Sequence, residues 1–183
     1  MSSKKIKLAI VGLGYVGLPL AVQFGKKIKN IKGFDLNHRR VNELLKFKDT
    51  TNELKSSDIK LAKNLKFTNK VEEIKDCNCF IVAVPTPVDK NKKPDFKLLN
   101  GACKLIGKIL KKNDIVIFES TVYPGATEEV CVPILEKNSN LKFNKDFFVG
   151  YSPERINPGD KKHKLENIVK IVAGSKPKIT DFL

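Results

Sequence analysis

Gly12, Gly14 and Gly17 restrict the possible folds of this chain more than any other part of it. They follow the run Ile-Lys-Leu-Ala-Ile-Val at 6–11, which is short, apolar and rich in β-branched residues. Such a run predicts a buried strand, and the apolar residues after the glycines predict a helix over about 15–28. A strand, a glycine-rich turn and a helix in this order favour a parallel α/β sheet.

The spacing Gly-x-Gly-x-x-Gly predicts a separate task for each glycine. Gly12 would permit the tight turn, Gly14 would let the backbone approach a pyrophosphate, and Gly17 would let helix and strand pack closely. The helix N-terminus would offer unpaired N–H groups and a partial positive charge to phosphates. A glycine-rich turn that serves only packing is the alternative.

An acidic residue at the expected distance supports a dinucleotide site. Asp35 ends a second predicted strand, 18 residues after Gly17. A carboxylate near this spacing accepts a hydrogen bond from the ribose 2′-hydroxyl of adenosine and repels a 2′-phosphate, which favours NAD over NADP. Arg39 and Arg40 leave an alternative open, since a nearby arginine accepts a 2′-phosphate or stacks on adenine.

The rest of the chain alternates between strand-sized and helix-sized segments. Residues 48–64 are polar and predict a loop with a short helix after Ser57. We expect further strands at 31–35, 65–67, 79–84, 114–119 and 147–151, and helices at 37–47 (with Asn37 as N-cap), 71–75, 96–110 and 125–137. This order predicts one doubly wound, Rossmann-like α/β domain over 1–183, with a parallel sheet and helices on both faces.

The charge of the chain does not match a nucleic-acid reader. The formal net charge is +15, but only three of the 35 basic residues are arginine, and the lysines are scattered along the chain. Base and phosphate readers rely on the bidentate fork of arginine. No apolar run approaches the roughly 20 residues that cross a bilayer, and the start of the chain lacks a signal-peptide pattern. We therefore expect a soluble, cytoplasmic protein with neither nucleic acid nor membrane as partner.

The cysteines do not predict a metal site. Cys77, Cys79, Cys103 and Cys131 form no CxxC pair and have no histidine neighbour. Zinc sites require such spacings, and disulfides are rare in cytosolic proteins. We expect four buried, unreactive thiols and no metal.

Three further motifs follow predicted strands, at the edge of the sheet where ligands bind in open α/β folds. They are Val84-Pro85-Thr86-Pro87, Glu119-Ser120-Thr121-Val122-Tyr123-Pro124-Gly125, and Tyr151-Ser152-Pro153-Glu154-Arg155-Ile156-Asn157-Pro158-Gly159. Taken singly, each has an ordinary structural interpretation: a rigid turn, a helix start and a surface ion pair. For Pro-Thr-Pro the residues alone favour neither interpretation: the Thr86 hydroxyl contacts a ribose or phosphate, or the segment is only a rigid turn.

Taken in order, the four motifs resemble those of the UDP-glucose/GDP-mannose dehydrogenases, NAD-dependent enzymes that oxidise a sugar C6 alcohol to a carboxylate. GLGYVGLPLA, VPTP, ESTVYPG and GYSPERINPGD are most similar to the bacterial branch that oxidises UDP-N-acetylglucosamine or UDP-N-acetylgalactosamine for capsule and O-antigen synthesis. The resemblance covers almost the whole chain but only the amino-terminal, cofactor-binding domain of that family. It implies that the central helix and the UDP-sugar-binding domain are absent here, and that full-length relatives dimerise.

The resemblance also assigns roles to individual residues. Thr121 and Glu154 would face the nicotinamide and the reacting C6 and help to hold the water that hydrolyses the intermediate. Asp35 and Arg40 would lie at the adenosine end. The complete cofactor-binding set is Gly12, Gly14, Tyr15, Val16, Gly17, Asp35, Arg40, Thr86 and Thr121.

Two departures from the family pattern limit this transfer. Pro158 stands where UDP-glucose members carry a second acid, as the N-acetylated-sugar branch does. The nucleophilic cysteine of the second oxidation, and the lysine and asparagine that assist it, would lie beyond this domain. Cys131 is not a substitute, because it follows Glu128 and Glu129 on an apolar helix face, where acidic neighbours disfavour a thiolate.

We therefore expect this chain to bind NAD and to fail to complete turnover alone. A non-catalytic dinucleotide-binding remnant, or a partner for a separately encoded second half, is the alternative. Another NAD-dependent dehydrogenase with a related first domain, such as a β-hydroxyacid enzyme, is disfavoured because ESTVYPG and SPERINPG would not be expected together there.

Overall fold

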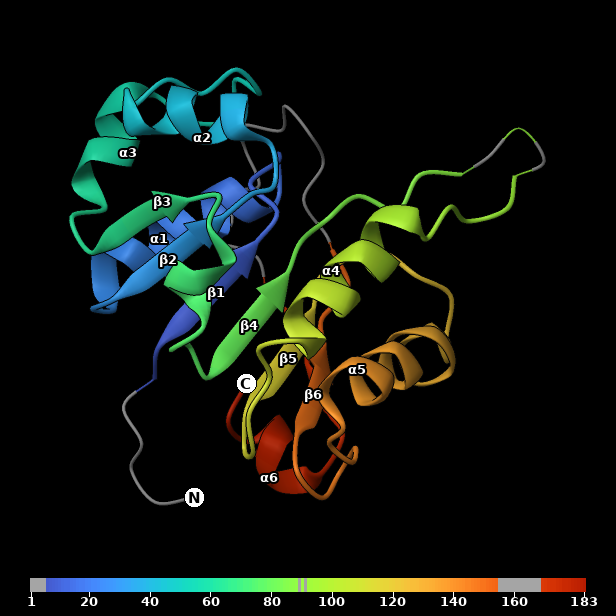
Figure 1. The fold of residues 1–183 in the computed structure, drawn as a ribbon. Helices are drawn as coiled ribbons and strands as arrows, with labels where there is room; N and C mark the ends of the chain where they lie inside the picture. Colours follow the sequence, from blue (N-terminus) through green and yellow to red (C-terminus); the bar gives the residue numbers. More distant parts are fainter. Residues whose placement is uncertain (1–5, 89, 91, 155–168) are drawn as a thin grey trace.

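The computed structural model describes residues 6–88, 90, 92–154 and 169–183 (Figure 1). Seven strands of this part of the chain form one sheet, in the order β3-β2-β1-β4-β5-β6-β7. Their bounds are β1 Leu8–Val11, β2 Ile31–Phe34, β3 Leu65–Thr68, β4 Cys79–Val82, β5 Ile115–Phe118, β6 Phe148–Tyr151 and β7 Ala173–Gly174. The six strands that the sequence predicts are all present and all parallel.

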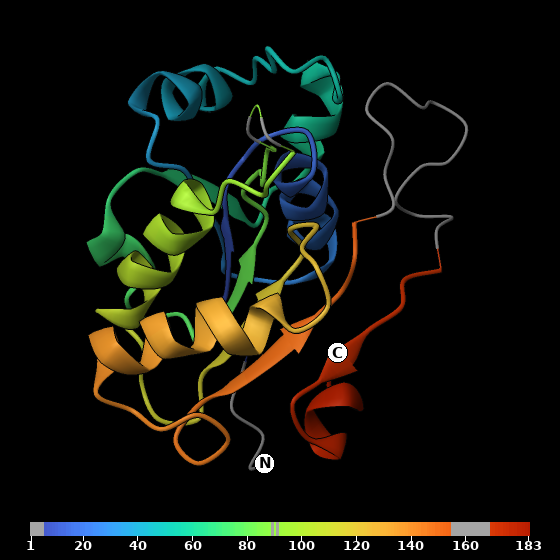
Figure 2. The same ribbon diagram turned by 90° about the vertical axis from the view of Figure 1, so that its right-hand side faces the viewer.

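Helices cover both faces of the sheet, as predicted. The helices are α1 Gly17–Lys27, α2 His38–Leu45, α3 Ser56–Leu61, α4 Lys97–Gly107, α5 Val132–Ser139 and α6 Pro177–Thr180, with a 3-10 turn at Val71–Ile74 and a π-helical turn at Thr127–Cys131. Figures 1 and 2 show α4 and α5 next to each other, on the face opposite α1.

The sheet separates two hydrophobic cores, because alternate side chains of each strand point to opposite faces. In β1, Leu8 and Ile10 point into the core under α1, α2, α3 and α6, whereas Ala9 and Val11 point into the core under α4 and α5. All four residues of β1, β4 and β5 are buried. These central strands therefore need apolar residues at every position, which is the continuous pattern seen in the sequence.

Two predictions about local structure are confirmed. Asn37 caps α2, since its side chain accepts hydrogen bonds from the backbone N–H groups of Arg39 and Arg40. The short helix expected after Ser57 is α3, which begins at Ser56.

Four elements differ from the prediction, one of them α6, for which the sequence predicted no helix. The helix expected over 125–137 begins as a π-helical turn at Thr127 and becomes α-helical only at Val132, after Gly125 with φ +94°. The segment 71–75 is a 3-10 turn and not an α-helix. The sheet is also not purely parallel, because β7 pairs antiparallel with β6. β7 spans only Ala173–Gly174, too short for a periodic signal.

The fold places a crevice beside β1. β2 pairs with β1 on one side, and β4 pairs with β1 on the other side. The strand order therefore reverses between β1 and β4. Ligands of open α/β sheets bind beyond the carboxyl ends of the strands at such a point. In the part of the chain that the structure describes, no helix is long and apolar enough to cross a membrane.

Candidate functional site

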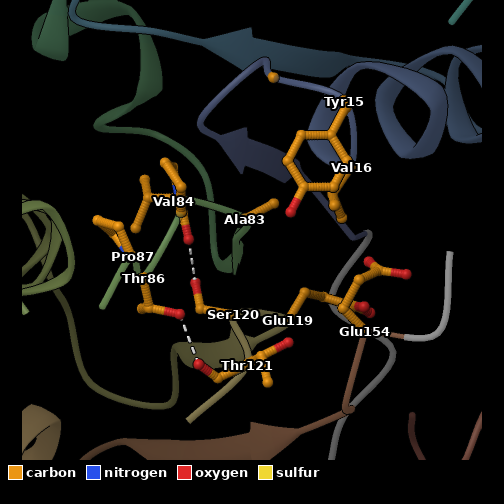
Figure 3. Close-up of a pocket in the computed structure, with 12 residues that line it drawn as sticks. Tyr15, Val16, Ala83, Val84, Thr86, Pro87, Glu119, Ser120, Thr121 and Glu154 are labelled. Carbon is orange, nitrogen blue, oxygen red and sulfur yellow. Dashed lines mark hydrogen bonds between the residues drawn. The ribbon is translucent and has the colours of Figure 1, made fainter. Parts of the chain in front are cut away.

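A cavity of about 350 Å³ opens at the carboxyl ends of β1, β4 and β5 (Figure 3). Its walls come from three of the sequence motifs and from the start of the fourth. The lining residues are Gly14, Tyr15, Val16, Ala83, Val84, Pro85, Thr86, Pro87, Glu119, Ser120, Thr121 and Glu154. Segments that are far apart in the sequence therefore meet at the place that the topology predicts for a ligand.

The three glycines of the first motif occupy different environments. A Cβ atom on Gly17 would lie 1.8 Å from the carbonyl oxygen of Gly12, so the start of α1 packs directly on the turn. A Cβ atom on Gly12 would lie 2.9 Å from the carbonyl oxygen of Ala83, and Gly12 has φ +94°. At Gly14 a Cβ atom would meet nothing within 4 Å. Gly14 thus leaves open space in the cavity wall, which fits the close approach of a pyrophosphate.

The amino-terminal end of α1 is suited to an anion. No described side chain caps it, and its first turn contains no acidic residue. α1 has 11 residues, long enough for its N–H groups and dipole to favour negative charge at this end. The residues around Gly14 therefore fit the phosphates of NAD.

Asp35 holds the glycine-rich turn from outside the cavity. One carboxylate oxygen accepts a hydrogen bond from the backbone N–H of Leu13 at 2.8 Å, and the other accepts from the backbone N–H of Asn37 at 2.8 Å. Asp35 is half-buried at the carboxyl end of β2. The carboxylate is thus oriented beside the turn, although it does not line the cavity.

Arg40 is engaged by the protein's own groups. Its Nε donates to the carbonyl oxygen of Leu13 at 2.8 Å, and its guanidinium forms an ion pair with Asp49 at 2.8 Å. Two further, longer hydrogen bonds join it to the hydroxyls of Thr50 and Thr51. Arg40 is buried and does not line the cavity, so a contact with adenosine stays a prediction. Arg39 is exposed and pairs with Glu43.

Asp49 was missed by sequence reasoning, although its side chain is fully buried. It accepts hydrogen bonds from the Thr51 hydroxyl at 2.7 Å and from the backbone N–H groups of Glu53 and Leu54 at 3.0 Å. Burial alone would raise the pKa of Asp49, but these bonds and the Arg40 guanidinium outweigh it and lower the pKa below its ordinary value. The only sequence signal was an aspartate followed by polar turn residues.

Two hydroxyls join the loops that follow β4 and β5. The hydroxyl of Thr86 donates to the carbonyl oxygen of Thr121 at 2.5 Å, and the hydroxyl of Ser120 donates to the carbonyl oxygen of Val84 at 2.6 Å (Figure 3). Thr86 and Thr121, which the sequence analysis placed along the cofactor, are therefore neighbours. Ser120 was not predicted as a site residue.

Two carboxylates lie on one side of the cavity. Glu119 and Glu154 both line it, and Glu119 forms an ion pair with Lys170 (Figure 3). Burial raises the pKa of the Glu119 carboxyl, the Lys170 ammonium opposes this shift, and the Glu154 carboxylate adds to it. Glu119 and Lys170 had no predicted role. Arg155 and Pro158 of the same motif as Glu154 lie outside the described residues.

The cysteines lie elsewhere. All four are buried, and none lines the cavity. Burial raises the pKa of Cys77 to about 11 and that of Cys79 to about 12, which keeps both as neutral thiols. A hydrogen bond with Cys131 and burial raise the pKa of Cys103. Among the described residues, no group of His, Cys, Asp and Glu could hold a metal ion.

Comparison with known families identifies the domain type. Residues 6–181 match the model of the UDP-glucose/GDP-mannose dehydrogenase family, NAD binding domain. Two curated relatives are UDP-N-acetyl-D-glucosamine 6-dehydrogenases. The protein from Pseudomonas aeruginosa is 57% identical over 180 residues, and the protein from Salmonella typhi is 52% identical over 179 residues. Each match covers 98% of this chain but 42% of the relative, so the chain spans about two fifths of their length.

Solved structures share the fold at lower identity. An NDP-N-acetyl-D-galactosaminuronic acid dehydrogenase from Methanosarcina mazei superposes with a TM-score of 0.85 at 29% identity, covering 96% of this chain and 40% of that protein. A UDP-D-ManNAc dehydrogenase from Pyrococcus horikoshii gives a TM-score of 0.82 at 28% identity, with 96% and 42% covered.

Proposed function

Since the chain belongs to the UDP-glucose/GDP-mannose dehydrogenase family and matches its NAD-binding domain, we propose that it supplies the NAD-binding half of a UDP-N-acetylhexosamine 6-dehydrogenase. The reaction is oxidation of the C6 alcohol of the sugar to the uronate. The observation that supports it most is one cavity lined both by Gly14, where a Cβ atom would meet nothing within 4 Å, and by Thr121 and Glu154. The relatives that are 57% and 52% identical support the N-acetylated sugar.

Each wall of the cavity has a task in this proposal. Gly14, Tyr15 and Val16 hold the pyrophosphate of NAD at the start of α1, while Asp35 accepts from the adenosine ribose. Thr86 lies along the cofactor. When bound, NAD supplies the acceptor for hydride from C6. The side chains that line the cavity then have to orient the nicotinamide end of the cofactor, since displacing a reacting group by about 1 Å can cost on the order of 100-fold in rate.

Thr121 and Glu154 serve the reacting end. Both line the cavity, Thr121 after β5 and Glu154 after β6, and a hydroxyl and a carboxylate that share a cavity can hold a water molecule by donating and accepting hydrogen bonds. That water would hydrolyse the intermediate of the second oxidation. None of the described cysteines lines the cavity, so the thiol nucleophile is not among them and the isolated chain does not complete turnover.

The remaining partners follow from the same assignment. The substrate is a UDP-N-acetylhexosamine, and the protein works in the cytoplasm without nucleic acid or membrane as partner. The scattered lysines and the scarcity of arginine support the exclusion of nucleic acid.

Binding titrations test the cofactor assignment. We expect the wild-type chain to bind NAD more tightly than NADP, and Asp35→Ala to reduce NAD affinity by about tenfold or more. Asp35→Asn checks the charge, because its amide keeps an acceptor for Leu13 but no longer repels a 2′-phosphate. Asp76→Ala is the control, since Asp76 is an exposed carboxylate that pairs with Lys7. Equal NAD and NADP affinities that Asp35→Ala leaves unaltered would overturn the assignment.

A turnover assay tests whether the isolated chain fails to complete the reaction. Incubation of the isolated chain with NAD and UDP-N-acetylglucosamine is expected to give no sustained NADH absorbance. NADH production at a rate comparable to that of a full-length relative would contradict it.

A further inference from the structure

A buried ion pair at the cavity has no role in the function proposed above. Glu119 directly follows β5 and lines the cavity, yet only 6% of its side chain is exposed. Its partner Lys170 lies 51 residues further along the chain, just before β7, with 19% of its side chain exposed. Burying a carboxylate costs free energy unless a partner compensates its charge. Lys170 provides that compensation.

The compensation of the Glu119 charge matters for the cavity because a second carboxylate, that of Glu154, lines it too. Glu119 and Glu154 line the same cavity, and the negative charge of Glu154 adds to the effect of burial in raising the pKa of Glu119. Figure 3 shows both side chains at the same end, away from Pro87. Without the ammonium of Lys170, this end would carry two negative charges. With it, the net charge of the three groups is that of a single carboxylate.

We propose that the Glu119–Lys170 pair sets the relative affinity of the cavity for oxidised and reduced nicotinamide. The proposal rests on the proposed function, because it takes the Thr121–Glu154 end as the nicotinamide end. The oxidised ring carries a positive charge and the reduced ring is neutral. An uncompensated carboxylate at this end would hold the oxidised ring too firmly relative to the reduced one. Lys170 cancels this excess, and Glu119 in turn prevents the ammonium from repelling the oxidised ring.

The pair can exert this effect because it is sheltered from water. Charges that are largely removed from solvent interact several times more strongly than charges on an exposed surface. The pair also joins two distant segments, since Lys170 precedes the edge strand β7 and Glu119 follows the central strand β5. A purely structural clamp would affect both forms of the cofactor equally, which separates the two roles experimentally.

The test measures dissociation constants of NAD⁺ and NADH for the chain and three variants. Glu119→Gln leaves the ammonium uncompensated, so the ratio of NAD⁺ affinity to NADH affinity should fall about fivefold or more. Lys170→Met leaves the carboxylate uncompensated and should shift the ratio in the opposite direction, measured at about pH 8.5 to keep Glu119 ionised despite its raised pKa. The double variant removes both charges and should restore the wild-type ratio.

Lys178→Met is the matched control. Lys178 lies 4.8 Å from the ring centroid of Phe148, the first residue of β6, at the end of the sheet opposite the cavity. The control removes the same charge from the chain and should leave the ratio unchanged. Urea unfolding of each variant shows whether it remains folded at the titration temperature. If one single variant unfolds, the ratio of the other single variant, compared with wild type and the double variant, still decides the inference.

The outcomes separate the inference from the proposed function. If wild type binds neither NAD⁺ nor NADH, the proposed function fails. If wild type binds both and the Glu119→Gln ratio equals that of wild type and of the double variant, the inference is overturned while the function stands. Equal losses of affinity for both forms would also overturn it, because they indicate a structural clamp.

Discussion

The two walls of the cavity are held in place by different kinds of interaction. The glycine wall, Gly14–Val16, is shaped by backbone contacts that exclude a Cβ atom at Gly12 and Gly17. The hydroxyl wall, made of Thr86, Ser120 and Thr121, is held by two side-chain hydrogen bonds to backbone carbonyl groups. A Cβ atom that overlaps a backbone atom forces the backbone to shift, at a cost of about 1–3 kcal/mol, whereas a single neutral hydrogen bond contributes only about 1 kcal/mol. The stability of the fold should therefore be less tolerant of substitution at Gly12 and Gly17, which support the glycine wall, than at the residues of the hydroxyl wall.

The largest expected effect concerns the support behind the glycine wall. Asp49→Ala removes the partner of Arg40, whose Nε holds the carbonyl of Leu13, and leaves a buried guanidinium uncompensated. The free energy of unfolding should fall by about 3–5 kcal/mol, measured by urea denaturation. Asp76→Ala, which breaks an exposed ion pair with Lys7, should cost less than about 1 kcal/mol. Similar losses in both variants would show that the buried pair does not support the wall.

The same pair gives the stability a pH dependence. Because the folded-state pKa of Asp49 is lowered, its contribution is complete above the unfolded-state pKa of about 3.9 and is lost as the pH falls through the folded value. The wild-type free energy of unfolding should thus decrease below about pH 4 more steeply than that of Asp49→Ala. Parallel curves for the two proteins in this range would contradict it.

Gly17→Ala and Gly14→Ala compare two positions in the same motif. The new Cβ atom of Gly17→Ala would lie 1.8 Å from the Gly12 carbonyl oxygen, so the free energy of unfolding should fall by about 1–3 kcal/mol. Gly14→Ala meets no such contact and should change it by less than about 0.5 kcal/mol, but weaken NAD binding about tenfold by filling the cavity wall. Equal destabilisation by the two substitutions would contradict the different environments.

The hydroxyl wall should respond more weakly. Ser120→Ala leaves the carbonyl of Val84 without that bond, and Thr86→Val does the same to Thr121. Each should lower the free energy of unfolding by about 1 kcal/mol and NAD affinity by about threefold. Thr86→Ser keeps the hydroxyl and is the control. A loss as large as that of Gly17→Ala would remove the distinction between the walls.

The smallest effect is expected for the thiols, none of which belongs to either wall. All four cysteines are buried, and burial raises the pKa of Cys77 to about 11 and that of Cys79 to about 12. Labelling by a thiol reagent at about pH 8 should therefore be very slow in the native chain. Labelling in denaturant should then reach all four cysteines. Rapid native labelling of Cys131 would reopen its exclusion as a nucleophile.

The comparison of walls also explains which residues sequence reasoning found. The structural roles predicted for Asn37, Gly12 and Gly17 are confirmed, because each role depends on a few neighbouring atoms. Asp49 was missed because its burial depends on the fold of the whole segment around it. Lys170 was missed for a similar reason, since its partner Glu119 lies 51 residues earlier and the two meet only in the folded chain.

The amino-acid sequence by itself determined the order of the six parallel strands, the apolar core and the dinucleotide motif, because strand burial, helix periodicity and glycine sterics act over a few residues. Only the tertiary structure decided that Arg40 turns inward to Asp49, that Thr86 and Ser120 tie two loops together, and that Lys170 compensates Glu119. These interactions depend on which side chains come together in three dimensions. Many residue types could form them, so no local sequence pattern predicts them.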